Sequence, residues 1–351
     1  MSYQLFYTWD IPRYGGNMSA ITIPNIHVTK NSNSFTDSLY AILSAKGVYS
    51  DEKFMLSALT GMAFKFVIHK RIIPSSIDMM SWEVDTKLAI ERIGFYNENY
   101  CGFTNDPTFP LYQRAAIEKI KRSIDKGTAI LTRSPKTIQF GVIYGYDDVD
   151  GIFYCQDRSH EGEMIPLLYQ NFGILDTACW YYAIIGDHVQ MNKRNLFIEA
   201  MILAVDEWET LYPCYPQTNK EYASGRLAYQ YLIDALKKED FHTFGAFHCL
   251  KTYCKSQQER ALFFKEVSNE FSEVERVYEI YQKVAELYQL VEQELKATYE
   301  ETVFNSKLTR NLVGIVEEAL VLEEQAMDFI KRCNEEILHN RFINYYDVNG
   351  Q

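Results

Sequence analysis

The sequence lacks the cysteine arrangements that mark zinc-binding domains and small disulfide-rich domains. Its seven cysteines are odd in number and scattered along 351 residues, and no two of them form a Cys-x-x-Cys pair. The spacing therefore predicts no zinc site of that kind. Scattered cysteines are typical of a reducing compartment, so we expect a cytoplasmic protein, and we predict neither a metal nor another cofactor.

Long apolar runs and export signals are also missing. No uncharged apolar stretch approaches the ~20 residues that a membrane-spanning helix needs. The first residues, Met-Ser-Tyr-Gln-Leu-Phe, lack the basic region and apolar run of a signal peptide. Positive charge is also in deficit, because 35 basic residues stand against 47 acidic ones and the formal net charge is −12. An acidic surface disfavours nucleic acid and anionic membranes as partners, and it would repel an acidic carrier protein.

The apolar residues that are present, 47% of the chain, are sufficient for one large or two medium domains. In the first half we expect a helix from Ser34 onward, with Ser34 and Asp37 as a variant capping box. Further helices are predicted over residues 53–70, 81–93 and 110–126. Strands are predicted over residues 129–132, 138–146, 151–157 and 180–185. Helices followed by an antiparallel sheet indicate an α+β domain over residues 1–190.

The pattern becomes helical after about residue 192. One apolar helix is predicted over residues 195–208, and two longer ones follow where apolar residues recur every three or four positions. Ser272 and Glu275 are predicted to form a capping box for the first of these two. We therefore expect an all-α helical bundle over residues 191–351. Its acidic residues Glu317, Glu318, Glu323 and Glu324 are predicted to lie on a solvated helix face.

Two segments, one predicted helix and one predicted strand, have sequence patterns that are typical of segments holding catalytic residues. The helix that begins at Ser34 has the sequence Ser-Phe-Thr-Asp-Ser-Leu-Tyr-Ala-Ile-Leu, and the strand that begins at Gln139 has the sequence Gln-Phe-Gly-Val-Ile-Tyr-Gly-Tyr-Asp-Asp. The helix is similar to the Cys-x-x-x-x-Leu-x-x-x-Leu opening of the bacteriocin-processing cysteine peptidases and of the N-terminal domain of butirosin biosynthesis protein H. The strand resembles the His-Phe-x-x-x-x-Gly-Tyr-Asp strand of those families, and Asp157 falls where their acid would lie.

Three further segments favour the butirosin H relatives. Residues 59–66 resemble the glycine-containing second helix of that family, and residues 224–236 resemble its Gly-Leu-x-Ala-Tyr-x-x-Trp-Ile-x-x-Leu segment. Residues 259–264 fit the Arg-x-x-Ala-x-x-Phe/Leu helix that follows. The resemblance spans most of the chain. It implies a papain-like domain, a helical bundle and a place in bacterial secondary metabolism, where active relatives move an acyl unit from a thioester to an amine.

The sequence departs from this pattern at both reactive positions. The family's cysteine corresponds to Ser34, and its histidine corresponds to Gln139. A serine hydroxyl is protonated near neutral pH and needs a base, whereas a glutamine amide cannot take up a proton. General base catalysis is commonly worth ~100 to 10,000-fold. We therefore expect little or no papain-type turnover from Ser34, Gln139 and Asp157.

Structural roles stay open at each of these positions. Ser34 can be a helix N-cap, Gln139 a strand glutamine bonded to backbone, and Asp157 a cap at the strand end. Among the histidines, His160 has the best position for reaching Ser34, but a solvated loop histidine is the favoured interpretation. His248 is predicted to pack in the helical core.

The predicted function is a catalytically altered or inactive papain-like protein that binds an acyl, peptidyl or amino-acid-bearing intermediate. One alternative is an active acyltransferase or amide-forming enzyme whose nucleophile is Ser34 or an unidentified cysteine. Another is a structural partner in a biosynthetic assembly. The expected partners are a small-molecule intermediate and a carrier or other biosynthetic protein.

Overall fold

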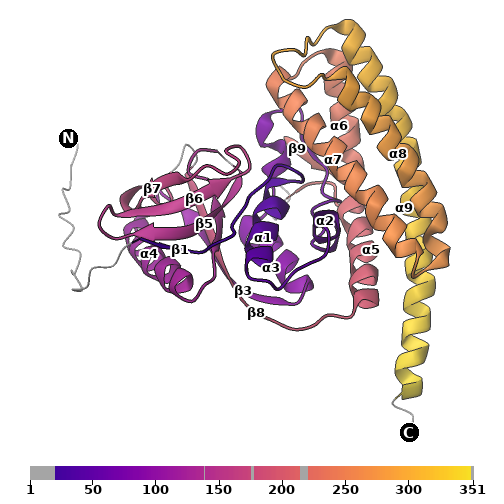
Figure 1. Ribbon diagram of the computed structural model, residues 1–351. Coiled ribbons are helices and arrows are strands. Elements are labelled where there is room, and N and C mark those ends of the chain that lie inside the picture. The colour runs from indigo at the N-terminus through magenta and orange to yellow at the C-terminus, as the bar shows by residue number, and fades with distance from the viewer. Residues whose placement is uncertain (1–19, 138, 175–177, 214–219, 349–351) are drawn as a thin grey trace.

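The computed structural model describes residues 20–348 apart from residues 138, 175–177 and 214–219, and it describes side chains as far as residue 336. The fold is a mixed α/β arrangement with an antiparallel sheet and several helices. Figure 1 shows the sheet at one end, helices α1 to α3 in the middle and the long helices of the second half at the other end. None of the helices in this part of the chain combines the length and the apolar character that crossing a membrane requires.

The sheet is antiparallel and has the strand order β3-β8-β4-β5-β6-β7, with β1 paired to β5. Its strands are β1 (Ile21–Thr22), β3 (Phe95–Phe103), β4 (Ile130–Arg133), β5 (Phe140–Asp147), β6 (Ile152–Asp157), β7 (Ile165–Leu168) and β8 (Cys179–His188). The predicted strands at 129–132, 138–146, 151–157 and 180–185 correspond to β4, β5, β6 and β8. Residue 138 lies outside the described residues. Strand β3 was not predicted, because its Asn, Glu and Tyr residues do not alternate in polarity.

The first-half helices are α1 (Ser34–Ala45), α2 (Lys53–Leu59), the 3₁₀ helix η1 (Pro74–Asp78), α3 (Trp82–Arg92) and α4 (Phe109–Asp125). Helix α1 packs on one face of the sheet, where the rings of Phe35 and Phe140 lie 5.3 Å apart. Helix α4 covers the other face, where Tyr146 donates a hydrogen bond to Asp125. Residues 140 and 146 reach opposite faces because β5 has an irregularity between Ile143 and Gly145.

A single helix over residues 53–70 was a wrong prediction. Helix α2 ends at Leu59, and the chain then turns and enters strand β2 (Val67–His69), which pairs with β9 (Tyr222–Ser224). The turn needs a glycine, because Gly61 has a φ of +82° and a Cβ there would lie 2.2 Å from a methyl carbon of Leu203. The second half contributes β9, so it is not purely helical.

Both predicted capping boxes were also wrong. Helix α1 is capped by Asn33, whose side chain accepts a hydrogen bond of 2.9 Å from the amide of Thr36, and Ser34 is the first helical residue. The second box fails because Ser272 begins a 3₁₀ turn, and the helix that follows has no side-chain cap.

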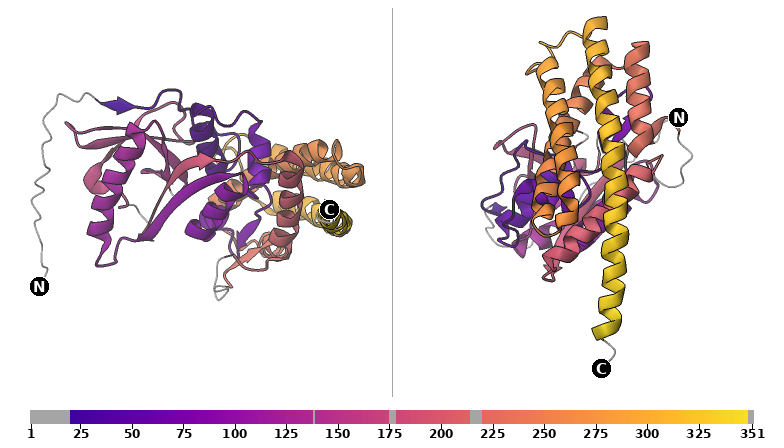
Figure 2. Two further views of the ribbon diagram at one scale, coloured as in Figure 1. Left: turned by 90° about the horizontal axis from the view of Figure 1, so that it is seen from below. Right: turned by 90° about the vertical axis from the view of Figure 1, so that its right-hand side faces the viewer.

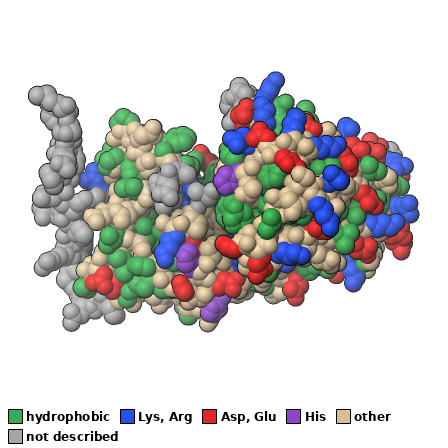
Figure 3. Space-filling view, turned by 90° about the horizontal axis from the view of Figure 1, so that it is seen from above, with side chains coloured by type: hydrophobic (Ala, Val, Ile, Leu, Met, Phe, Trp, Pro, Cys, Tyr) green, Lys and Arg blue, Asp and Glu red, His purple; other side chains and the backbone are tan. Residues whose placement is uncertain are grey.

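The second half contains five α-helices and the 3₁₀ helix η3 (Ser272–Val274) within the described residues. The α-helices are α5 (Lys193–Glu209), α6 (Gly225–Lys238), α7 (Thr243–Ser268), α8 (Glu275–Glu294) and α9 (Ser306–Val348). Figure 2 shows α9 running past the other helices at its C-terminal end. Charged side chains of both signs are spread over this half in the view of Figure 3, whereas the sheet half has more apolar and uncharged surface.

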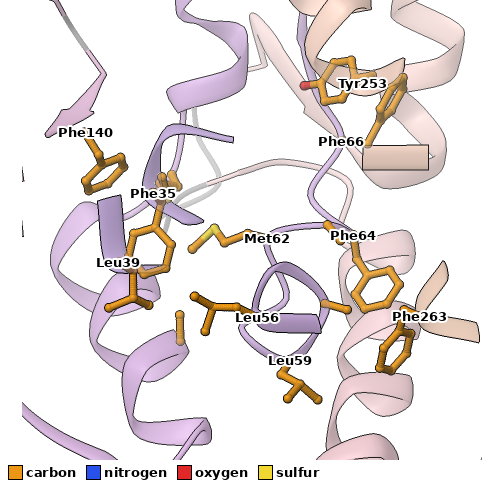
Figure 4. Close-up of a cluster of buried hydrophobic side chains, with 14 of the residues drawn as sticks. Phe35, Leu39, Leu56, Leu59, Met62, Phe64, Phe66, Phe140, Tyr253 and Phe263 are labelled. Atoms are coloured by element: carbon orange, nitrogen blue, oxygen red, sulfur yellow. The ribbon is translucent and has the colours of Figure 1, made fainter. Parts of the chain in front are cut away.

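The two halves share one hydrophobic core. Figure 4 shows buried side chains of α1, the turn after α2 and α7 in a continuous cluster, with Met62 between Phe35 and Phe64. The division at residues 190 and 191 stays a prediction, since the shared core and the β2-β9 pair join the parts on either side of it.

A buried ion pair lies at the centre of this junction. Arg260 of α7 donates to both carboxylate oxygens of Glu323 in α9, at 2.9 and 2.8 Å, and to the carbonyls of Ala63 and Phe64 in the turn after α2. Glu323 is fully buried, so its prediction as part of a solvated face was wrong. A buried carboxylate needs such partners, because the cost of desolvating it is large.

We expect Glu323→Gln to lower the free energy of unfolding by about 3–5 kcal/mol, because it leaves the Arg260 charge buried without a counterion. Urea unfolding followed by circular dichroism measures this. The matched control is Glu324→Gln, which removes a pair with Arg226 whose side chains are 38% and 66% exposed and should cost about 0–1 kcal/mol. Equal losses in the two variants would contradict the assignment.

Candidate functional site

Ser34 lies at the first turn of α1 and lines a small cavity between α1, η1 and α7. The residue is 6% exposed, and its hydroxyl forms no hydrogen bond with another described residue. The cavity has a volume of about 30 Å³. Its polar lining includes Ser34 from α1, Asp78 from η1 and Thr252 and Ser256 from α7, and its apolar walls are Phe35, Met62, Ile77, Met80 and Phe140. Thr252 and Ser256 face it together because residues four apart share one side of a helix.

Gln139 lies just before β5, and its side chain reaches the same helix α7. Its Nε2 is 3.4 Å from Nε2 of His248, and its Oε1 is buried without a hydrogen-bond partner. His248 is one turn before Thr252, so the Gln139 contact and the cavity that Ser34 lines lie at neighbouring turns of one helix face. Burial, then Arg158 and Lys30, lower the pKa of His248 to about 4. The imidazole is therefore neutral near pH 7.

His248 was predicted to pack in the helical core, and its contact with Gln139 was missed. The sequence contains a signal for it, since His248, Thr252 and Ser256 recur at intervals of four on α7. Such a polar stripe on a helix that is otherwise buried indicates a face turned toward other polar groups. The sequence does not reveal which segment lies opposite this stripe.

Asp157 is fully buried at the end of β6 and is bonded to neighbouring loops. One carboxylate oxygen accepts a hydrogen bond from the hydroxyl of Ser134. The other accepts from the amides of Ser159 and His160, at 2.9 and 3.0 Å, and lies 2.9 Å from Nδ1 of His160. These bonds cap the strand end and hold the His160 ring beside Asp157.

The sheet register separates Asp157 from Ser34. Asp157 pairs with Gly141, so it shares the sheet face opposite to that of Phe140, which packs on α1. Arg158, the next residue, points to the α1 face, and its Nε lies 3.4 Å from a carboxylate oxygen of Asp37. No hydrogen bond joins any two of Ser34, Gln139 and Asp157, and no described histidine is hydrogen-bonded to Ser34.

Buried charges surround the start of α1. Asp37 accepts a hydrogen bond of 2.8 Å from Lys53 and two more from backbone amides. Burial raises its pKa, although Arg158 and Lys53 oppose that shift. The side chain of Arg158 is 6% exposed, and its Nε and Nη1 donate no hydrogen bond. Within the described residues, this cluster combines a carboxylate with two cations.

Two buried acids, Asp78 of η1 and Glu259 of α7, have raised pKa values. Asp78 has a carboxylate oxygen, Oδ2, that is buried without a partner. Burial raises its pKa to about 7, against the opposing charges of Arg133 and Arg158. Burial likewise raises the pKa of Glu259 on α7 to about 7, and this side chain accepts a hydrogen bond of 2.6 Å from Ser57. Both acids are therefore close to half protonated near neutral pH.

The described cysteines do not supply a reactive thiolate. Burial raises the pKa of Cys249, the one packed against η1, to about 12. Burial and the carboxylate of Glu83 raise the pKa of Cys101 to about 12. A thiol with such a pKa is protonated at neutral pH and is a weak nucleophile. Cys214 lies outside the described residues. Among the residues that the structure describes, no three His, Cys, Asp or Glu side chains gather as metal ligands.

No model of a known protein family matches this chain, and no curated protein matches it.

We expect Asp78→Asn to flatten the dependence of stability on pH. The pKa of Asp78 is about 7 in the folded protein and ~4 in an unfolded chain. Folded Asp78 therefore holds its proton where the unfolded chain loses it, so its contribution makes stability fall as pH rises from 4 to 7. Asparagine has no proton to lose, and the variant should gain up to ~4 kcal/mol relative to the parent over this range.

Urea unfolding at pH 4, 5.5, 7 and 8 measures the effect. Asp234→Asn is the control, since the Asp234 side chain is 61% exposed beside Lys238, and its profile should follow that of the parent protein. A parent profile and an Asp78→Asn profile that run parallel would show that Asp78 ionises normally.

Proposed function

We propose that the protein is a catalytically altered papain-like protein, similar to the butirosin H-type proteins of bacterial secondary metabolism, that binds an acyl, peptidyl or amino-acid-bearing small molecule between α1 and α7. One observation carries this proposal. Ser34, at the start of α1, and Asp78, whose Oδ2 has no hydrogen-bond partner, line the same small cavity, which provides polar groups for a ligand without an imidazole beside the hydroxyl.

No described histidine is hydrogen-bonded to Ser34, and Asp78, which lines the same cavity, forms no hydrogen bond with it; both facts argue against acyl transfer through Ser34. An attacking hydroxyl needs a proton acceptor within about 2.6–3.2 Å, directly or through one water. His248 contacts Gln139, and the low pKa of His248 makes it a weak base. His160 is held by Asp157 at the far face of the sheet. Binding without covalent chemistry is therefore the better account of Ser34.

The cavity volume limits which part of a ligand enters. A water molecule needs roughly 10–15 Å³ of such space, so about 30 Å³ has room for about two oxygen-sized atoms. The remainder of a larger ligand would lie at the cavity edge, where Asn33, Lys65 and Ile77 are only partly buried. Lys65 is held away from the ligand by Asp85 and Glu207, at 3.2 and 2.9 Å.

The papain-like assignment is supported by the arrangement of α1 and the sheet. A helix whose first turn opens into a cavity packs on an antiparallel sheet, as the resemblance implies. The helical second half adds α7 as one wall of the cavity, so a ligand would contact both halves. A small-molecule intermediate is favoured over a direct macromolecular partner, because this cavity is narrow.

The main alternative is an active acyltransferase with Ser34 as nucleophile, and intact-protein mass spectrometry distinguishes it from binding. We expect no covalent adduct after incubation with acetyl and aminoacyl N-acetylcysteamine thioesters. Ligand-detected NMR should nevertheless show binding of at least one of them, because the cavity is intact without chemistry.

Ser256→Leu places a larger side chain in the cavity and should weaken this binding at least tenfold. Ser268→Leu, at the end of the same helix, is the matched control and should leave it unchanged. An adduct that disappears in Ser34→Ala would establish the enzyme alternative. A protein that binds none of these thioesters, with Ser256→Leu behaving like the parent, would refute the proposal.

A further inference from the structure

The cavity at the start of α1 has hydrogen-bond donors and acceptors that no protein group uses. Oδ2 of Asp78 is buried without a hydrogen-bond partner, and the residue is only 9% exposed. The hydroxyl of Ser34, a residue that is 6% exposed, forms no hydrogen bond with another described residue. An unpaired buried polar group costs about 1–3 kcal/mol. The unpaired Asp78 oxygen, together with the Ser34 hydroxyl in the same cavity, indicates a site for a polar ligand atom.

The helix itself favours a negatively polarised ligand. Helix α1 has 12 residues and its first turn lines the cavity. The Asn33 side chain caps only the amide of Thr36. The first amides of a helix have no partner within it, and together they carry a partial positive charge that attracts anions. Ser34 belongs to this first turn.

The charges that face Asp78 also favour an anion over a cation. Arg133 and Arg158 are close enough to stabilise its ionised form, whereas Cys249 and Tyr253 of α7 are neutral thiol and phenol groups. Lys65 is the remaining charged group of the lining. Asp78 is thus the lone acid among the described lining residues, and an ammonium ligand would lie near the two arginines around it.

Space selects the size of the anion. The volume of about 30 Å³ holds about two oxygen-sized atoms. A carboxylate has two oxygens on one carbon and can accept hydrogen bonds at both. A phosphate or sulfate has four oxygens and would not fit without displacing Phe35 or Phe140, which are 1% and 0% exposed.

We propose that this cavity binds the carboxylate group of a small ligand, with the Ser34 hydroxyl, the Asp78 carboxyl and the first turn of α1 as its hydrogen-bond partners. The inference deepens the proposed function, and it rests on that function only in taking this cavity as the ligand site. Two carboxyl groups share one proton in such a contact, as like charges require when both are buried. The apolar walls accept the carbon atoms next to the carboxylate.

Binding should therefore depend on pH through Asp78. The carboxyl donates only when it is protonated, and its pKa of about 7 leaves it mostly protonated at pH 6 and mostly ionised at pH 8. The affinity for a carboxylate should fall roughly tenfold between these pH values. An asparagine at this position offers an N–H donor at both pH values, so Asp78→Asn should retain binding and lose the pH dependence.

The test is an NMR titration of the full-length protein with ¹³C-labelled sodium formate at constant ionic strength, with sodium chloride added in the blank. Formate should bind saturably, roughly tenfold tighter at pH 6 than at pH 8. Asp78→Asn should bind within about threefold of the parent at pH 6 and equally at pH 8. Asp78→Leu should lose at least tenfold at pH 6. Circular dichroism checks that each variant is folded, and Ser34→Ala, with an expected loss of at least threefold, serves if Asp78→Leu does not fold.

The outcomes separate this inference from the proposed function. Formate that fails to bind, or that binds equally to the parent and Asp78→Leu, overturns the carboxylate site. Binding that is stronger at pH 8, or binding of methylammonium in place of formate, also overturns it. Thioester binding that is abolished by Ser256→Leu while formate fails would leave the proposed function intact and remove only this inference.

Discussion

The buried contact between Arg260 and Glu323 is the interaction on which the position of α7 depends. One guanidinium joins α7 to α9 and also donates to two carbonyls of the turn after α2. Tyr229 of α6 donates to the same carboxylate at 2.7 Å, and Tyr288 of α8 donates to Tyr229. Four helices and the α2 turn therefore meet at a single charge pair, which cannot be shifted without leaving a charge unpaired in the core.

Helix α7 in turn connects this pair to the candidate site. Thr252, Tyr253 and Ser256 form one wall of the cavity and lie within about two turns on the N-terminal side of Arg260. His248 lies one turn closer to the N-terminus than Thr252 and contacts Gln139. The opposite wall belongs to α1 and β5. A change in the angle of α7 would alter the cavity and the Gln139 contact together, so the ion pair fixes the geometry of the site as well as the fold.

The site is electrostatically unusual because it combines acids and cations away from water. Burial is the dominant influence on the pKa of Asp37, Asp78 and Glu259 and raises all three, although Asp37 is also paired with Lys53 and Arg158. Such perturbed groups cluster at functional sites more often than elsewhere, although structural ion-pair networks perturb pKa values too. The distinguishing feature here is the cavity at the N-terminal end of α1, where Oδ2 of Asp78 has no hydrogen-bond partner, whereas a purely structural network would supply one.

Local pattern alone determined the strands β4, β5, β6 and β8, the start of α1 at Ser34 and the helical second half, because alternation and three-to-four spacing are properties of neighbouring residues. Tertiary structure alone decided the rest. Strand register turned Asp157 to the sheet face opposite α1. Packing of distant segments placed His248 against Gln139 and brought Asp78 into the same cavity as Ser34. It also buried Glu323 beside Arg260. Those contacts join residues between 44 and 109 positions apart or depend on which side of a strand faces which helix, and a single sequence carries no direct record of either.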